Sequence, residues 1–172
     1  MIRTLALAGL SLAVVGLTLT PFMGGRSRAA EAELTSPQSD YLEHCGGCHG
    51  LQGDTTPAQV PVLRGRVGYF MCTQAGRRYL IRLPNIAHSR IDDDQRLAEM
   101  MNFVVFGLGG SSAPLRAKAF TAAEVTGLRG DAMSGPALLK TRAVVVKDLI
   151  KSCGAPASLR YFYPGQENAA GH

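Results

Sequence analysis

Two cysteines and a histidine stand together in the sequence as Cys45-Gly-Gly-Cys48-His49. On a helix, two thiols one turn apart can add to the two vinyl groups on one edge of a haem, and the adjacent imidazole then projects from the same face toward the iron. A thioredoxin-type redox pair is one alternative, but the sequence lacks the βαβ pattern that it needs. Half of a zinc site is another, and it would need a second Cys/His pair at ligand spacing. The motif therefore predicts one covalently attached haem c, held by Cys45, Cys48 and His49.

Residues 1–32 have the composition of an export signal. Arg3 precedes an uncharged run from Leu5 to Met23, and the small-residue stretch Ala30-Glu31-Ala32 is the best cleavage site. The run also reaches the lower limit of what spans a bilayer, so an uncleaved membrane anchor is the alternative. Because haem of this type is attached outside the cytoplasm, the signal agrees with the haem motif. We expect a periplasmic protein, at the membrane only if the segment stays uncleaved.

The charge of the chain gives no sign of a nucleic-acid partner. Its formal net charge is +5, and it falls to +3 without residues 1–32, which hold three arginines and one glutamate. No run of Lys and Arg alternates with aromatic residues, as nucleic-acid binding would favour. The chain has 20 Gly, 9 Pro and no Trp, which indicates a loop-rich protein whose ordering needs more than apolar side chains.

Two further cysteines, Cys72 and Cys153, belong to no motif. In an oxidising compartment two leftover cysteines usually pair, so we expect a disulfide between them. The alternative is a pair of buried thiols.

Periodicity and capping signals predict an all-α domain of four or five short helices. A first helix is expected from Tyr41 to about Cys48, with Asp40 as its N-cap and Glu43 completing a variant of the capping box. Residues 50–66 are expected to be loop, and residues 76–83 a short helix, with a strand as the alternative.

The best-defined helix is expected at 92–106, because three acidic residues at its start suit the positive end of the helix dipole. Its apolar side chains recur on one face: Leu97, Met100, Met101, Val104, Val105 and Leu108. The capping box Thr121-x-x-Glu124 predicts a helix through Leu128. A last helix is expected to start at Pro136 and to end before Gly154, its C′ residue, with a strand possible at 143–146. Its expected buried face is Leu139, Ala143, Val146, Ile150 and Cys153.

The stretch from Tyr41 to His49 resembles the opening of class I c-type cytochromes, and Pro61-Val-Leu63-Arg-Gly is similar to the Pro-x-Leu-x-Gly stretch of that family. The resemblance covers residues 38–106, and extends at most to 129. It implies a cytochrome c-like domain at 33–130, wrapped around one haem, and leaves 131–172 as a C-terminal extension. It also implies that the Pro61 carbonyl accepts the ring N–H of His49 and that Leu63 lies against the haem. An ordinary loop proline is the alternative for Pro61.

The second axial ligand departs from the family pattern, in which a Met-Pro pair often precedes the later helix. Here that place reads Leu83-Pro84, and leucine cannot bind iron. His88, in the loop before the helix, is the first substitute, and an open iron is the next. The methionine candidates are Met100, Met101 and Met133. A sulfur ligand would raise the reduction potential and a second imidazole would lower it, whereas an open position would admit small molecules.

The resemblance implies a one-electron carrier. It would accept electrons from a periplasmic dehydrogenase and pass them to an oxidase or another cytochrome. No Ser/His/Asp or paired-carboxylate arrangement indicates an enzyme. Four arginines are candidates for the partner-facing rim or for pairing with the haem propionates, with plain solvated arginines as the alternative: Arg64, Arg66, Arg77 and Arg78. Two other functions stay open. One is a haem subunit bound permanently to a dehydrogenase through 131–172, and the other is an open-site haem protein acting on peroxide or a diatomic gas.

Overall fold

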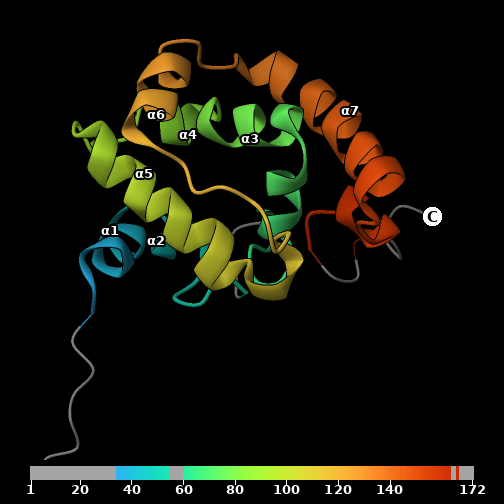
Figure 1. Ribbon diagram of the computed structural model, residues 1–172, viewed down its shortest axis with the longest axis horizontal. Helices are drawn as coiled ribbons and strands as arrows, with labels where there is room; N and C mark the ends of the chain where they lie inside the picture. Colours follow the sequence, from blue (N-terminus) through green and yellow to red (C-terminus); the bar gives the residue numbers. More distant parts are fainter. Residues whose placement is uncertain (1–33, 55–59, 164–165, 167–172) are drawn as a thin grey trace, which may run out of the picture. The chain divides into compact units, whose positions relative to one another are not determined.

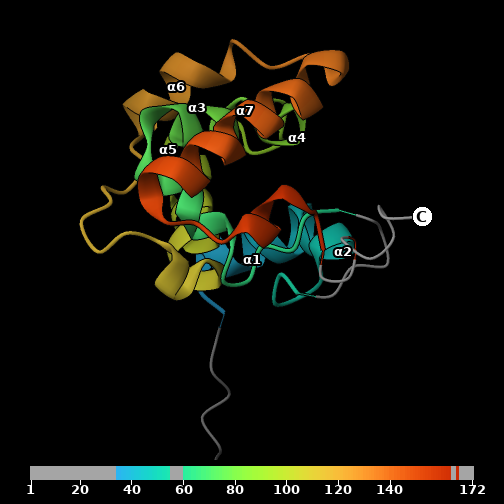
Figure 2. The ribbon, with the colours of Figure 1, turned by 90° about the vertical axis from the view of Figure 1, so that its right-hand side faces the viewer.

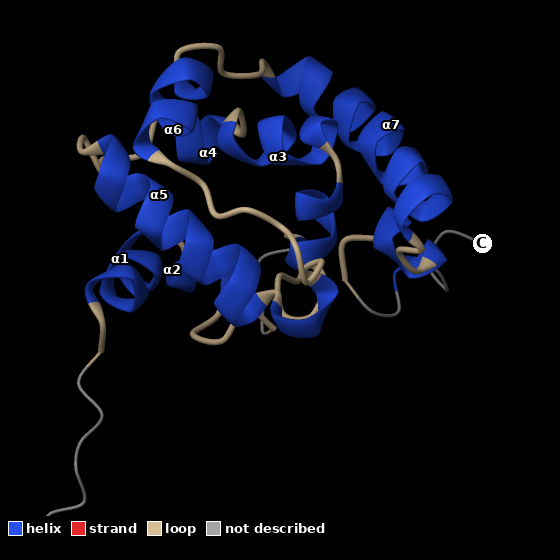
Figure 3. Ribbon diagram, viewed as in Figure 1, coloured by secondary structure: helices blue, strands red, loops and turns tan. Residues whose placement is uncertain are grey.

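A computed structural model describes residues 34–54, 60–163 and 166, so the predicted signal at 1–32 lies outside it. Within these residues all regular structure is helical and no strand occurs (Figure 3), which confirms the all-α class. The α-helices are α1 Ser36–His44, α2 Gly46–His49, α3 Gln74–Ile81, α4 Pro84–Ala87, α5 Asp94–Asn102, α6 Ala122–Arg129 and α7 Gly135–Cys153. Shorter helical turns are η1 Val67–Cys72, the π-helical η2 Phe103–Leu108, η3 Gly110–Ser112 and η4 Ala157–Arg160. No described helix is long and apolar enough to cross a membrane.

The apolar face predicted for the best-defined helix is confirmed, since all six of its side chains are buried in the core. The Asp93 carboxylate caps α5 by accepting the Arg96 N–H at 2.9 Å. The helix continues as η2, which ends where Gly109 N–H donates to Val104 O at 2.9 Å. Glycine is needed there, because a Cβ on Gly109 would lie 2.8 Å from the backbone nitrogen of Gly68. This close approach lets η1 lie against the end of η2.

The prediction that Asp40 caps the first helix is wrong. The helix begins five residues earlier, at Ser36, with Thr35 as N-cap and Gln38 accepting the Thr35 N–H at 2.8 Å. The Asp40 side chain is instead buried and pairs with Arg96 of α5, whose Nε donates to Oδ2 at 2.8 Å. Arg96 Nη2 donates to the other carboxylate oxygen. The carboxylate therefore joins α1 to α5, which lie side by side in Figure 1.

Replacing Arg96 by Ala should lower the urea midpoint of unfolding at neutral pH more than Arg116→Ala, which removes an exposed arginine. The hydrogen bonds from Arg96 hold the pKa of Asp40 below its ordinary value. A carboxylate with a lowered folded pKa contributes stability above its unfolded pKa and loses it as pH falls through the folded pKa. The difference in urea midpoint between Arg96→Ala and Arg116→Ala should therefore shrink as the pH falls from 5 to 2. A difference that stays constant over this range would contradict the ion-pair explanation.

The remaining predicted helices form, and neither strand alternative does. Thr73 caps α3 by accepting the Gly76 N–H at 3.1 Å, and Thr121 caps α6 by accepting the Glu124 N–H at 3.2 Å. The Glu124 carboxylate does not return to the cap, since it accepts the Nε–H of the buried Arg77 at 3.0 Å. Arg77 is therefore a structural residue that joins α3 to α6, and not a solvated or partner-facing one. Gly154, with φ of 65°, ends α7 as predicted.

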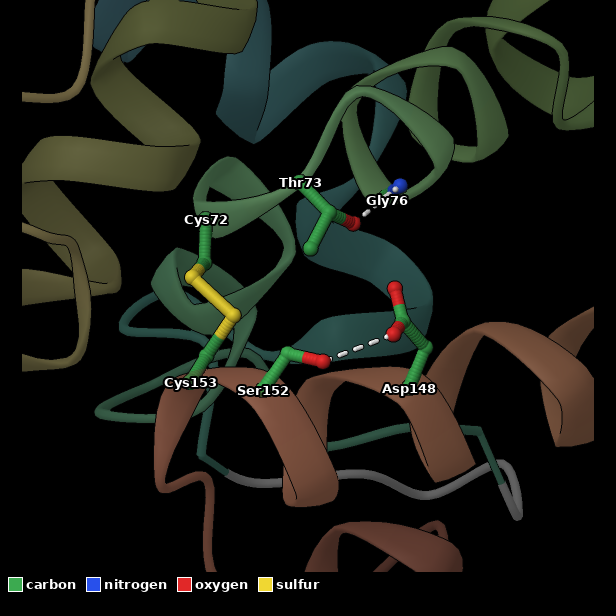
Figure 4. Close-up of a disulfide and its surroundings, with 6 residues drawn as sticks. All are labelled: Cys72, Thr73, Gly76, Asp148, Ser152 and Cys153. Carbon is green, nitrogen blue, oxygen red and sulfur yellow. Dashed lines mark hydrogen bonds between the residues drawn. A yellow bond between two sulfur atoms is a disulfide. The ribbon is translucent and has the colours of Figure 1, made fainter.

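The buried face of α7 differs from the predicted one. Its buried residues are Arg142, Val145, Val146 and Leu149, whereas Leu139, which was expected inside, is 59% exposed. The helix packs against α3 and η1 (Figure 2). The predicted disulfide between Cys72 and Cys153 is present, with the Cα atoms 6.3 Å apart. Figure 4 shows it joining the end of η1 to the last turn of α7.

Candidate functional site

The Cys-x-x-Cys-His motif lies where α1 passes into α2. The two helices are separated only at Cys45, and the backbone hydrogen bonds continue through it. Cys45 N–H donates to Tyr41 O at 2.8 Å, and His49 N–H donates to Cys45 O at 3.0 Å. Cys45 and Cys48 are therefore one helical turn apart, as the motif requires, and both are free thiols.

These three side chains lie on the wall of one cavity of about 400 Å³. Such a volume is within the range of small-molecule and cofactor sites, roughly 300–1,000 Å³. Most of the wall is apolar, and its residues come from positions between 44 and 162. Apolar side chains from the middle of the chain include Leu63, Val67, Phe70, Leu80, Leu83 and Val104.

The ring of His49 is held by the backbone of the loop that follows the motif. Its Nδ1 lies 2.9 Å from the carbonyl oxygen of Pro61. A carbonyl can only accept, so Nδ1 carries the proton and Nε2 keeps its lone pair. Burial lowers the pKa of His49, an effect that the bond to Pro61 partly opposes, so the ring is neutral at neutral pH. His49 is therefore ready to act as a metal ligand.

Two backbone contacts hold the loop segment that carries the Pro61 carbonyl. The Gly53 carbonyl accepts the Leu63 N–H at 2.8 Å, and Val62 N–H donates to the Phe162 carbonyl at 2.8 Å. Gly53 has φ of 74°, and a Cβ there would lie 3.1 Å from the Cβ of Leu63. Glycine is thus required at Gly53, and the C-terminal segment helps to place the partner of His49.

His88, the first choice for a second axial ligand, is not brought to this cavity. It is exposed at the end of α4 and lines a separate hollow with Glu43 and His44. The wall carries Leu83 and Met101 instead, while Met100 and Met133 are buried in the core away from the cavity lining. Met101 is thus the one methionine among the described residues whose side chain reaches the wall.

The C-terminal extension contributes part of the wall, which the sequence did not predict. Five residues of α7, η4 and the segment after it line the cavity: Leu138, Leu139, Arg142, Leu159 and Phe162. Arg142 is only 6% exposed. Of the four arginines proposed for the rim or the propionates, only Arg66 is on the cavity wall, whereas Arg64 forms an exposed ion pair with Asp54. A search for an apolar helical stripe passes over a buried arginine, so periodicity could not have found Arg142.

Two competing uses of the motif are not favoured by its surroundings. Burial, with a smaller effect from Cys48, raises the pKa of the Cys45 thiol to about 11, whereas the reactive thiol of a redox pair has a lowered pKa. A structural zinc ion takes four protein ligands, and the described residues hold no group of three or more His, Cys, Asp or Glu suited to a metal. A haem iron needs no such group, because the porphyrin supplies four of its ligands.

Comparison with known proteins places the chain in no family, since no family model, curated protein or solved structure matches it. The chemistry of the site therefore rests on its residues. They provide two thiols, a fixed imidazole with a free Nε2, an apolar cavity and a buried guanidinium on its wall.

Proposed function

We propose that the chain is an exported c-type cytochrome, with one covalent haem in the cavity, that passes single electrons between periplasmic proteins. The observation that carries this proposal is the 2.9 Å contact from His49 Nδ1 to Pro61 O on the wall shared with Cys45 and Cys48. A metal-ligating histidine almost always donates its other ring N–H to a carbonyl, carboxylate or water, which fixes the tautomer and raises its basicity.

The residues around the cavity fit this cofactor. Cys45 and Cys48 would form the two thioether bonds, His49 would supply Nε2 to the iron, and Leu63 would give apolar contact. When bound, haem c supplies one-electron chemistry through the ferric and ferrous states of its iron. The protein's own residues hold the imidazole, exclude water with an apolar wall and set the surrounding charge.

The proposed partners are a periplasmic dehydrogenase as electron donor and an oxidase or another cytochrome as acceptor. Cys48 is exposed while Cys45 is half-buried, so the edge attached through Cys48 would be the one nearest to a partner. Electron-transfer complexes are small, transient and steered by charge. Such contacts need no fixed docking segment.

A second candidate function is an open-site haem protein that binds a diatomic gas or acts on peroxide. The observation that favours it is the position of His88, which is exposed and away from the cavity, together with Leu83 on the wall. In that case the iron would have only His49 as a protein ligand.

Visible spectra of the ferric and ferrous holoprotein should separate the two candidates. The electron-carrier proposal makes Met101 the sixth ligand, so the ferric protein should be low-spin with a methionine-to-iron charge-transfer band. Met101→Leu should abolish that band and turn the iron high-spin, because leucine offers no donor. Met100→Leu is the matched control, since Met100 is equally buried but does not line the cavity.

Variation of His88 completes this test. His88→Ala should leave the spectrum unchanged, because the side chain is not on the cavity wall. A wild-type protein that is high-spin and insensitive to Met101→Leu would replace the carrier with the open-site function. A loss of the low-spin spectrum in His88→Ala would restore His88 as the ligand.

A further inference from the structure

A buried positive charge lies on the cavity wall without an acidic partner among the described residues. Arg142 Nη2 donates to Leu159 O at 2.9 Å and Nη1 donates to Arg160 O at 3.2 Å. Its guanidinium carbon lies 4.6 Å from the ring centroid of Phe162. No carboxylate of the described residues forms an ion pair with it. Arginine stays protonated in proteins, so the charge is not compensated by the described part of the chain.

Three other arginines of limited exposure have an acidic partner. Arg77, Arg82 and Arg129 each form an ion pair, with Glu124, Asp131 and Asp94 respectively. Isolated charges are costly in a protein interior, so buried arginines normally have such partners. Arg142 departs from this pattern, and it lines the cofactor-sized cavity.

A second cation increases the cost of the first. Arg66 also lines the cavity and donates to Ser158 O at 2.7 Å and Tyr161 O at 2.9 Å. Burial lowers the pKa of Arg142, Tyr79 raises it, and Arg66 lowers it further by charge repulsion. An anion in the cavity would offset the cost of burying the Arg142 charge and would weaken its repulsion from Arg66.

We propose that Arg142 is the counter-charge for the carboxylates of the haem and that the C-terminal helix raises the reduction potential of the cofactor through it. This inference rests on the proposed function. A guanidinium binds a carboxylate through two parallel hydrogen bonds, and Arg142 uses only two of its five N–H donors on the backbone. A nearby cation favours the ferrous form, which carries one positive charge fewer than the ferric form.

A purely structural role for Arg142 predicts different behaviour. Its two backbone bonds end on η4, so it could serve only to hold that turn. In that case every substitution would loosen η4 alike, and the retained charge of a lysine would make no difference to the potential. Charge and hydrogen bonding can therefore be separated by substitution.

The test is a spectroelectrochemical titration of the holoprotein at pH 7 and low ionic strength. Arg142→Gln removes the charge, Arg142→Lys keeps it, and Lys147→Gln removes an exposed charge from the same helix. We expect Arg142→Gln to lower the ferrous-to-ferric ratio at a fixed potential about tenfold, a shift of about 59 mV for one electron. Arg142→Lys should keep most of the wild-type potential, and Lys147→Gln should change it little. Equal shifts in Arg142→Gln and Arg142→Lys, or a shift no larger than that of Lys147→Gln, would overturn the proposal.

A second measurement covers the case in which Arg142→Gln does not accumulate. In Arg142→Lys the bidentate contact is lost, so the haem carboxylates should take up protons at higher pH than in the wild type. The potential should then fall more steeply between pH 5 and pH 9, and a profile identical to wild type would reject the contact. Covalent haem content, measured by haem staining of a denaturing gel, tests the proposed function separately. Wild-type protein without haem defeats that function, whereas loaded variants with unchanged potentials defeat only the role of Arg142.

Discussion

Protein with both Cys45→Ala and Cys48→Ala, expressed from the full sequence in a bacterium that attaches haem c, should contain no covalent haem and should lose its folded core. The proposed haem would fill the cavity of about 400 Å³ and supply a large share of the apolar core of a domain of this size. Without it, the apolar side chains of the wall would lose that contact. Circular dichroism and haem staining of a denaturing gel measure the two losses.

The matched control removes the other two cysteines. Cys72→Ala/Cys153→Ala deletes the same number of thiols but leaves the motif intact, so it should still carry covalent haem. A Cys45→Ala/Cys48→Ala protein that remained folded without haem would show that the cavity does not depend on a cofactor. The central proposal would then fail.

Loss of the disulfide should have the second largest effect. Cys72 and Cys153 are 81 positions apart in sequence, and the chain-entropy model gives about 4.5 kcal/mol of stabilisation for closing a loop of that length. Cys72→Ala/Cys153→Ala should lower the free energy of unfolding by about that amount, and the Tm by on the order of 10 °C for a domain of this size. Urea unfolding of the haem-loaded protein measures the change.

The comparison that isolates the bond is the wild type with and without a reductant. Reduced wild type should unfold at the same urea concentration as the double alanine variant. The oxidised wild type should yield no alkylatable Cys72 or Cys153 thiol when denatured. Because the bond holds the end of α7 to η1 (Figure 4), reduction should also loosen the helix that carries Arg142. Equal stability of the oxidised and reduced proteins would contradict the stabilising role of the bond.

The position of α7 bears on the proposal that residues 131–172 dock the protein permanently to a dehydrogenase. The described part of this extension packs on α3 and η1, and it lines the cavity through Arg142, Leu159 and Phe162. These contacts support a role within the protein's own site. Leu139 and Val144 remain exposed on α7, so a partner surface there stays a separate proposal.

Local chemistry made much of this protein predictable from its sequence. The buried face of α5 and η2 follows from a 3.6-residue period, and Thr121 and Gly154 mark helix ends because their signals act within one turn. The cysteine pair followed from what an oxidising compartment does to leftover thiols. The Cys-x-x-Cys-His motif and the loop proline named the residues of one cavity wall, because their chemistry lies in residue type and spacing.

Only the tertiary structure decided the features that depend on distant residues. Asp40 satisfies the local rule for an N-cap, yet it binds Arg96, 56 positions away. His88 stands near the position where class I c-type cytochromes, which the sequence resembles, keep a ligand, but its side chain is exposed, and Met101 lines the cavity while His88 does not. Arg142 belongs to a polar residue type, and its burial on the cavity wall follows from the packing of α7 on α3 and η1. Hydrogen bonds within a turn can be predicted from neighbouring residues, whereas the wall of a cavity is set by which helices meet across it.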